Sequence, residues 1–388
     1  MTEFHESTGA KNDGLAIDAD YPGDNIIVEA IDGDTVQLQP DLRDTTTWWF
    51  YWNFRVRAAA GRTLTFAFSG KSPIGVRGPA VSTDSGETWA WLGTKAVQGS
   101  TFRYTFAAGY DEVRFAFTYP YLEADLRQFL ARHEAGGLIQ VGELCKSSDG
   151  RSVEWLSLGR NPDAPHRVAL LCRHHACETM ASFLLEGILE AAVSDTPHAR
   201  WLREHAQILA VPFMDKDGVE KGDQGKNRAP HDHNRDYIAQ SIYPEVRAIR
   251  EFLPQWSAGK LSVGLDLHCP WIRGGSGGPG DNEQVFFVGG PDERAWARVQ
   301  VLASALESVQ NGPIVYSPQH DMPYGVGWNT STGNCAQWLA ARAGEPAAAT
   351  IEFPYANAGG TAVTPKTARL FGHDVARAVR AYLDEKTL

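Results

Sequence analysis

One stretch of the chain decides its fold class: Val168-Ala169-Leu170-Leu171-Cys172-Arg173-His174-His175-Ala176-Cys177-Glu178-Thr179. Its apolar first half has the length of a buried strand, and its polar second half opens a helix. Strands and helices continue to alternate from about residue 119 onward. Strands are predicted at 167–172, 207–213, 261–267, 284–288 and 348–353, and helices at 178–193, 242–255, 292–308 and 366–385. The alternation predicts an α/β fold with a mixed, mainly parallel sheet covered by helices.

The preceding part of the chain has a different character. Residues 25–118 are rich in aromatic and β-branched residues with period-2 stretches, as in 48–57 and 63–68. Turn sequences interrupt these stretches at intervals typical of an antiparallel sandwich. We therefore predict a flexible leader at 1–24, an all-β antiparallel sandwich domain at 25–118 and an α/β domain at 119–388.

Composition narrows the classes of partner. The 388 residues carry a net charge of −11, without a dense run of lysine and arginine. Nucleic acid and anionic membranes are therefore poor partners, whereas peptides, proteins and small molecules are suitable. The first residues lack the pattern of a signal peptide, and the five cysteines are irregularly spaced, which favours reduced thiols in a cytoplasmic protein. The oligomeric state is left open.

Three residues form a candidate metal centre. His175 and Glu178 are three positions apart at a strand-to-helix turn, where such residues share a face. His268 follows the strand predicted at 261–267 and lies at the rim of the same sheet. Two imidazoles and one carboxylate are the ligands of a catalytic Zn²⁺ that keeps a fourth position open. On its own, the first pair is weak evidence, because residues at this spacing are more often solvated groups at a helix start.

Other potential ligands lie close by in the sequence. Cys172, Cys177 and Cys269 flank the candidate ligands, but their spacing fits no structural zinc motif, and buried small apolar residues are the better interpretation. Three histidines rank below His175 as ligands: His174, His231 and His233.

Glu352 is a candidate catalytic residue. It ends an otherwise apolar strand, a place where a charged carboxylate needs a functional reason or a route to solvent. A general base that accepts a proton from water would provide such a reason.

Further motifs follow in a characteristic order. They are a turn at 215–218, Arg228, the pair Asn234-Arg235, Asp266-Leu267-His268 and finally Glu352. With the first ligand pair, this series resembles the zinc carboxypeptidase family. The resemblance implies one Zn²⁺ per chain and hydrolysis of the C-terminal peptide bond by water that the zinc activates, with Glu352 as general base.

The same resemblance assigns roles to four more residues. Arg228 would polarise the scissile carbonyl and stabilise its oxyanion. Asn234 and Arg235 would clasp the C-terminal carboxylate of a peptide or protein substrate. Asp232 would fix a ligand imidazole through its far nitrogen.

The N-terminal part carries a second resemblance. Residues 82–89 and 115–121, set in an aromatic β-domain, are similar to the cytosolic carboxypeptidase subgroup. That subgroup includes enzymes that remove glutamates from polyglutamylated proteins, which extends the implied substrates to C-terminal or side-chain-linked glutamate.

Several departures leave the substrate open. Asp215-Lys216 replaces the usual Asn-Pro of the turn, and Trp328-Asn329 stands where a substrate-binding tyrosine is expected. Ala336 and Gln337, near the expected specificity pocket, offer no charge. Two alternatives remain: an N-acyl-amino-acid deacylase similar to succinylglutamate desuccinylase, and a catalytically silent binding protein that uses the β-domain.

Overall fold

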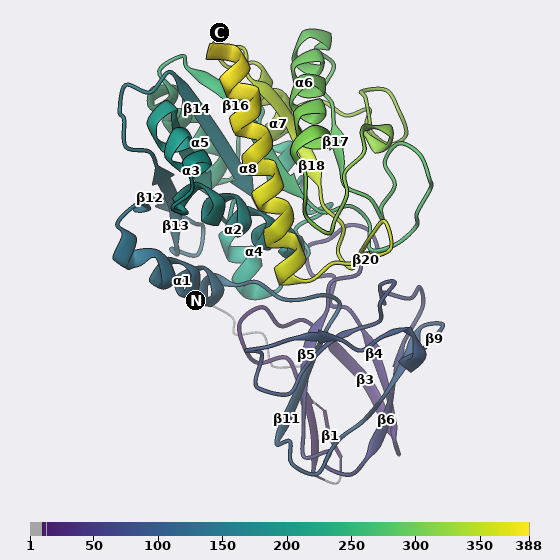
Figure 1. Ribbon diagram of the computed structural model, residues 1–388. Coiled ribbons are helices and arrows are strands. Elements are labelled where there is room, and N and C mark those ends of the chain that lie inside the picture. Colours follow the sequence, from purple (N-terminus) through teal and green to yellow (C-terminus); the bar gives the residue numbers. More distant parts are fainter. Residues whose placement is uncertain (1–9, 13, 388) are drawn as a thin grey trace.

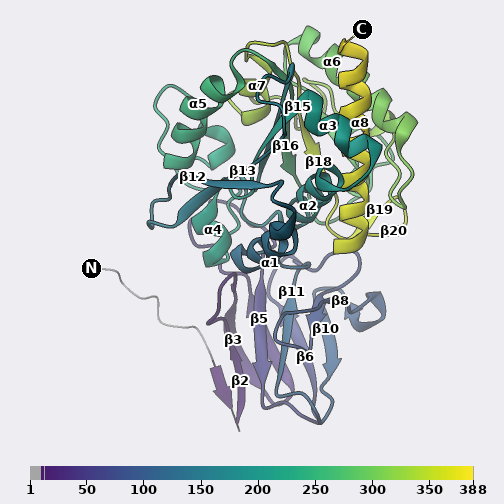
Figure 2. The ribbon, with the colours of Figure 1, turned by 60° about the vertical axis from the view of Figure 1, so that its left-hand side comes forward.

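The computed structural model describes residues 10–12 and 14–387. Figures 1 and 2 show two β-sheets formed by the N-terminal part of the chain, and a larger α/β unit that lies against one end of them. The two parts share one continuous hydrophobic core.

The N-terminal sheets have the strand orders β1-β2-β5-β11-β7-β8 and β3-β4-β6-β10-β9. Their bounds are β1 Ala10–Asn12, β2 Leu15–Asp18, β3 Ile27–Asp32, β4 Thr35–Gln39, β5 Asn53–Arg57, β6 Thr63–Phe68, β7 Ala80–Ser82, β8 Ala90–Trp91, β9 Val97–Gln98, β10 Thr101–Thr105 and β11 Glu112–Ala116. Phe54 and Phe115 of one sheet contact Phe66 of the other, at ring-centroid distances of 5.4 and 5.3 Å. The aromatic residues of β5, β6 and β11 are thus sandwich core, whereas Trp48 and Trp49, before β5, pack against Trp271 of the α/β unit. The pairing of β4 with β6 is parallel, unlike the antiparallel arrangement that the sequence predicts.

The flexible leader predicted at 1–24 is wrong for its second half. Residues 1–9 and 13 lie outside the described residues. Strand β2 pairs with β5, and Leu15 and Ile17 are fully buried. The segment is short, so its alternation of apolar and polar residues is a weak signal in the sequence.

The α/β unit contains a seven-stranded sheet in the order β12-β13-β15-β14-β16-β18-β17. Its strands are β12 Gln140–Lys146, β13 Ser152–Leu158, β14 His166–Cys172, β15 Ala206–Val211, β16 Leu261–His268, β17 Phe286–Val288 and β18 Ala347–Glu352. The four central strands are parallel, and β12, β13 and β17 are antiparallel to their neighbours. A two-stranded ribbon adds β19 Asn357–Ala358 and β20 Thr361–Ala362. The mixed α/β fold is as predicted.

Helices cover both faces of this sheet (Figures 1 and 2). They are α1 Glu123–His133, α2 Thr179–Val193, α3 Pro197–His205, α4 Lys216–Lys221, α5 Pro244–Ser257, α6 Glu293–Val309, α7 Cys335–Ala340 and α8 Pro365–Thr387. Helices α2, α6 and α8 pack together on one face, whereas α5 and α7 bury their apolar sides on the other. Both faces of the central strands are thereby buried, which explains their continuous apolar sequences.

The N-terminal sheets are fixed against the carboxyl end of the large sheet. Tyr355, just beyond β18, contacts Phe50 and Phe117 at ring-centroid distances of 5.5 and 5.3 Å. The side-chain oxygen of Gln224 accepts hydrogen bonds from the backbone N–H groups of Phe50 and Tyr51. Residues that follow the central strands therefore lie next to the β-sandwich.

Candidate metal and catalytic site

The predicted ligands come from the carboxyl ends of two neighbouring parallel strands. After β14 the chain turns sharply at Arg173, whose φ of 61° is left-handed. The buried Arg173 guanidinium donates to the carbonyls of Tyr121 and Ala176 and to the Ser182 hydroxyl, and these bonds hold the turn in place. The turn brings His175 and Glu178 beside His268, the last residue of β16.

Three short distances join the ligand atoms. Nδ1 of His175 lies 2.9 Å from Oε1 of Glu178, and Nδ1 of His268 lies 2.7 Å from Oε2 of Glu178. The two imidazole Nδ1 atoms are 3.2 Å apart. A ligand set of two nitrogens and one carboxylate, converging in this way, fits a divalent ion such as Zn²⁺.

Charges around Glu178 keep it ionised. Burial alone raises the pKa of a carboxyl group, but the His268 and Lys226 charges outweigh burial and hold the pKa of Glu178 well below its usual range. The ligand carboxylate is thus available in the charged form that binds a metal ion.

Glu352 lies directly beside the three candidate ligands His175, Glu178 and His268, which together are named the metal cluster. It ends β18, where the strand register pairs it with His268. Its side chain is buried, and burial raises the pKa of its carboxyl group. Its Oε2 atom has no hydrogen-bond partner within 10–12 and 14–387. An acceptor with these properties next to a metal ion is suited to take a proton from water.

Lys226 is a further residue at the cluster, and the sequence did not single it out. Its Nζ atom lies 2.7 Å from Oε1 of Glu178 and donates to the carbonyl of Cys269. Burial would lower the pKa of this amine, but the carboxylates of Glu178 and Glu352 raise it, so the group is a fixed cation.

The backbone around Lys226 is pressed against the ligand turn. Gly225, immediately before it, has a φ of 77°, and a Cβ atom there would lie 2.4 Å from the backbone nitrogen of Ala176. Only glycine fits so close an approach. A Gly-Lys pair is not distinctive in the sequence, because residues 70–71 and 259–260 are also Gly-Lys, so no local signal indicates this contact.

Among the described residues, Arg228 makes no hydrogen bond or ion pair with the candidate ligands or with Glu352. Its guanidinium contacts three carboxylates: Asp215 at 2.7 Å, Asp223 at 3.0 Å and Asp44 at 2.5 Å. Asp44 belongs to the N-terminal part of the chain, so Arg228 links that part to the loop after α4. The role at the scissile carbonyl stays a prediction for Arg228, and its contacts are those of a structural ion-pair network.

The other three predicted residues lie around the ligands. Asp232 Oδ1 is 3.5 Å from Nε2 of His175, the nitrogen that faces away from Glu178. Asn234 Nδ2 is 3.2 Å from Nε2 of His268, and the Asn234 side-chain oxygen accepts from the backbone N–H of Cys335. Arg235 is partly exposed and helps to lower the pKa of Asp232 after the larger effect of His175.

The other potential ligands, which are histidines and cysteines near His175 in the sequence, are distinguished by their contacts. His231 is 2.7 Å from Asp236, and the His233 ring stacks on Tyr243 at a ring-centroid distance of 3.6 Å, so both take part in other interactions. Cys172, Cys177 and Cys269 are buried free thiols. His174 differs from these residues, because it belongs to a second group with Asp266 and Cys335.

The residues expected to contact substrate differ in exposure. Trp328 is 53% exposed, whereas the side chain of Asn329 is buried and donates to the carbonyls of Gly289 and Met322. Tyr324, nearby, has a partly exposed ring whose hydroxyl donates to the carbonyl of Thr330. None of these contacts identifies a substrate-binding tyrosine.

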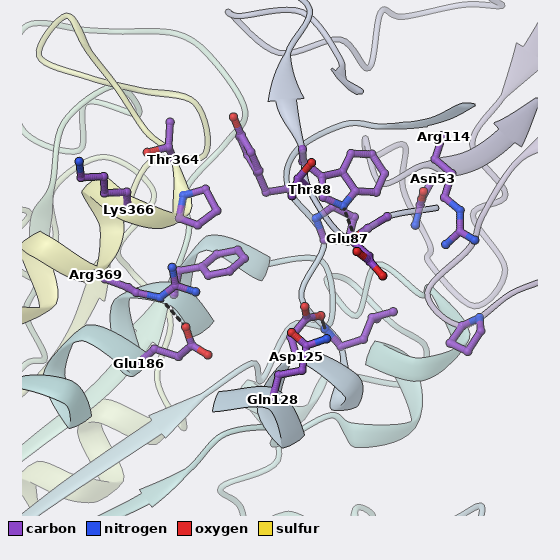
Figure 3. A pocket seen from close by; sticks show the side chains of 18 of the residues that line it. Asn53, Glu87, Thr88, Arg114, Asp125, Gln128, Glu186, Thr364, Lys366 and Arg369 are labelled. Carbon is purple, nitrogen blue, oxygen red and sulfur yellow. Dashed lines mark hydrogen bonds and ion pairs between the residues drawn. The ribbon is translucent and has the colours of Figure 1, made fainter. Parts of the chain in front are cut away.

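A separate cavity of about 490 Å³ lies between the β-sandwich and helices α1, α2 and α8. Figure 3 shows Lys366, Arg369 and Glu186 on one side of it, and Glu87 and Arg114 on the other. Its lining contains none of the predicted ligands or catalytic residues. The cavity is therefore distinct from the metal cluster.

Comparison with solved structures identifies the class of fold. A metallo-carboxypeptidase from Burkholderia cenocepacia superposes with a TM-score of 0.79 at 21% identity, over 96% of this chain and all of that chain. A metallo-carboxypeptidase from Pseudomonas aeruginosa gives 0.76 at 24% identity, over 95% and 99% of the two chains. The chain therefore has the fold of these metallo-carboxypeptidases over nearly its whole length.

Comparison with curated sequences shows which carboxypeptidases the chain is similar to. An uncharacterised protein from Zymomonas mobilis is 28% identical over 66% of this chain and 67% of its own length. Cytosolic carboxypeptidase 2 from Danio rerio is 28% identical over 60% of this chain, and cytosolic carboxypeptidase 6 from Caenorhabditis elegans is 23% identical over 60%. The matches span only 37% and 56% of these two relatives.

These comparisons confirm the predicted relationship to the zinc carboxypeptidases, a family of hydrolases, and within it to the cytosolic carboxypeptidase subgroup. No family model matches the chain. Among the described helices, none combines the length and the apolar character needed to cross a membrane.

Proposed function

We propose that this protein is a zinc-dependent carboxypeptidase that removes the C-terminal residue from peptides or proteins. The observation that carries the proposal is the convergence of His175, Glu178 and His268, with Glu352 in register beside His268. A divalent ion held by these ligands would polarise the scissile carbonyl and lower the pKa of a water molecule.

Two residues of the chain supply the proton transfers and the positive charge that stabilises the oxyanion. Glu352, with its raised pKa and unpaired Oε2, accepts the proton of the attacking water and delivers it to the leaving amine. We propose that Lys226 stabilises the developing oxyanion, since its ammonium group is the cation that contacts the cluster.

Two neighbouring residues are proposed to recognise the end of the substrate. Arg235, partly exposed beside Asp232, would receive the C-terminal carboxylate together with the amide of Asn234. Asp232 would hold His175 in its orientation through Nε2. A clasp for a terminal carboxylate limits cleavage to the chain end.

A peptide panel tests this proposal. Peptides that end in acidic, basic, aromatic and aliphatic residues are each offered to the zinc-loaded protein with a free and with an amidated C-terminus. Glutamate ends and a side-chain-linked glutamate are included because of the related subgroup. Mass spectrometry should detect loss of one residue from free ends only.

Two other results would contradict the proposal. Cleavage of N-acyl amino acids without release from any peptide would identify a deacylase. Binding of peptides by the zinc-loaded protein without any hydrolysis would identify a silent binding protein.

A further inference from the structure

A second group of potential metal ligands lies beside the catalytic cluster. His174 precedes the ligand His175, and Asp266 precedes the ligand His268 by two residues on β16. Cys335 begins α7, which packs on the same strand. One ligand atom from each of His174, Asp266 and Cys335 lies within 4.8 Å of the others, and all three side chains are fully buried. The group has no exposed face at which a substrate could bind.

Buried polar atoms of this group face one another at short range. His174 Nδ1 lies 2.8 Å from Asp266 Oδ1, and Asp266 Oδ2 lies 2.8 Å from Nε2 of His268. A cation bound between His174 and Asp266 would balance the charge of this fully buried carboxylate. Oε2 of Glu178 lies in the same way 2.7 Å from Nδ1 of His268 among the candidate ligands of the first site.

The orientation of His174 suits a metal ligand. Its Nε2 atom is 2.8 Å from the hydroxyl of Tyr237, and this contact fixes the ring from the far side. Nδ1 is thereby directed toward Asp266. An imidazole held through one nitrogen while the other binds the ion is the usual arrangement of a metal-binding histidine.

We infer that His174, Asp266 and Cys335 form a second, buried metal site for a thiophilic divalent cation such as Zn²⁺. One nitrogen, one oxygen and one sulfur donor suit zinc and other borderline-soft ions. Binding transfers the thiol proton of Cys335 to water, so the thiolate and the Asp266 carboxylate together balance the charge of the ion.

The second site would support the first. Oδ2 of Asp266 lies 2.8 Å from Nε2 of His268, so an ion bound to Asp266 fixes the carboxylate behind a catalytic ligand. This inference concerns metal binding and does not depend on the proposed peptidase activity.

Metal counting on the full chain tests the inference. The protein is stripped with a chelator, reloaded with Zn²⁺, dialysed, and analysed by elemental mass spectrometry beside Cys335→Ser and the matched control Cys172→Ser. Cys172 is also a buried free thiol but is outside the group. We expect two zinc ions per chain in the wild type and the control, and one in Cys335→Ser.

Cobalt substitution provides an independent readout. A thiolate bound to Co²⁺ gives a charge-transfer band in the near ultraviolet, which should appear in the wild type and in Cys172→Ser and be absent in Cys335→Ser. His174→Asn should lower the zinc content to one in the same way, and it serves as the second variant should Cys335→Ser fail to fold. One zinc per wild-type chain, or a thiolate band that survives in Cys335→Ser, would overturn the inference.

Discussion

Replacing Lys226 and Arg228 separately by methionine should show that Lys226 serves catalysis and that Arg228 serves stability. Both changes remove one positive charge from the same loop and keep an unbranched side chain. Arg228 is 8% exposed and contacts Asp215, Asp223 and Asp44 within 3.0 Å. Lys226 instead contacts the ligand Glu178 at 2.7 Å.

The expected magnitudes follow from these contacts. Loss of Arg228 leaves the buried Asp215 without its arginine partner, whereas Asp223 keeps Arg43 at 2.8 Å. Removing one partner of a buried ion pair should lower the free energy of unfolding by about 3–5 kcal/mol. In Lys226→Met the bound metal ion still pairs with Glu178, so we expect a stability loss below about 2 kcal/mol. Its kcat/KM should fall by about 10²–10³-fold, as for removal of an oxyanion donor.

Two assays on the zinc-loaded variants measure these effects. Urea denaturation gives the free energy of unfolding, and hydrolysis of a good peptide substrate gives kcat/KM under conditions where each variant is folded. The reasoning is refuted if Arg228→Met keeps its stability and loses more than about 100-fold in kcat/KM while Lys226→Met remains active. That result would indicate that Arg228, and not Lys226, polarises the scissile carbonyl and stabilises its oxyanion.

Two further predictions concern other carboxylates. Asp232→Asn should weaken zinc binding by about ten-fold or more, because Asp232 supports His175; competition with a chromophoric chelator measures this, and unchanged affinity would exclude the role. Burial raises the pKa of Asp321 to about 7, against an ordinary value of 3.8. The folded state therefore keeps this proton over a pH range in which the unfolded chain has lost it, and Asp321 makes stability fall as pH rises from about 4 to 7. Asp321→Asn should reduce that fall by at most about 4 kcal/mol between urea denaturation curves at pH 4 and 8; equal pH dependence in both proteins would show that Asp321 titrates normally.

The central strands and long helices could be predicted because burial dictates their sequences. Strands β14, β16 and β18 are covered on both faces and read as apolar runs. The edge strand β12 is largely exposed, so its sequence lacks the alternation that would indicate a strand. Short elements such as α4 and α7 are too brief for a helical period to be recognised.

The convergence of the candidate ligands and Glu352 could also be predicted, because their positions follow from strand ends. His268 and Glu352 end neighbouring parallel strands, and this topology alone places them side by side. Lys226 and Arg228 are two positions apart on an irregular loop. Lys226 contacts the metal cluster, whereas Arg228 contacts other carboxylates. This difference depends on the approach of Gly225 to Ala176 and on the carboxylates around Arg228, contacts between segments distant in sequence.

The second group was missed for a related reason. The sequence makes His174 a rival to His175 for one site, because it does not place Cys335 near His174. Helix α7 brings Cys335 to Asp266 from 69 positions further along the chain. Only the packing of α7 on the sheet reveals that the two adjacent histidines face different partners.

Release of C-terminal residues by the zinc-loaded wild type and by Glu352→Gln tests the central claim most directly. Glutamine keeps the shape of Glu352 but cannot accept the proton of the attacking water. We expect mass spectrometry to show release by the wild type, and a loss of at least about 10²-fold in the variant with its zinc content unchanged. Equal rates in both proteins, or no release by the fully zinc-loaded wild type, would contradict the account.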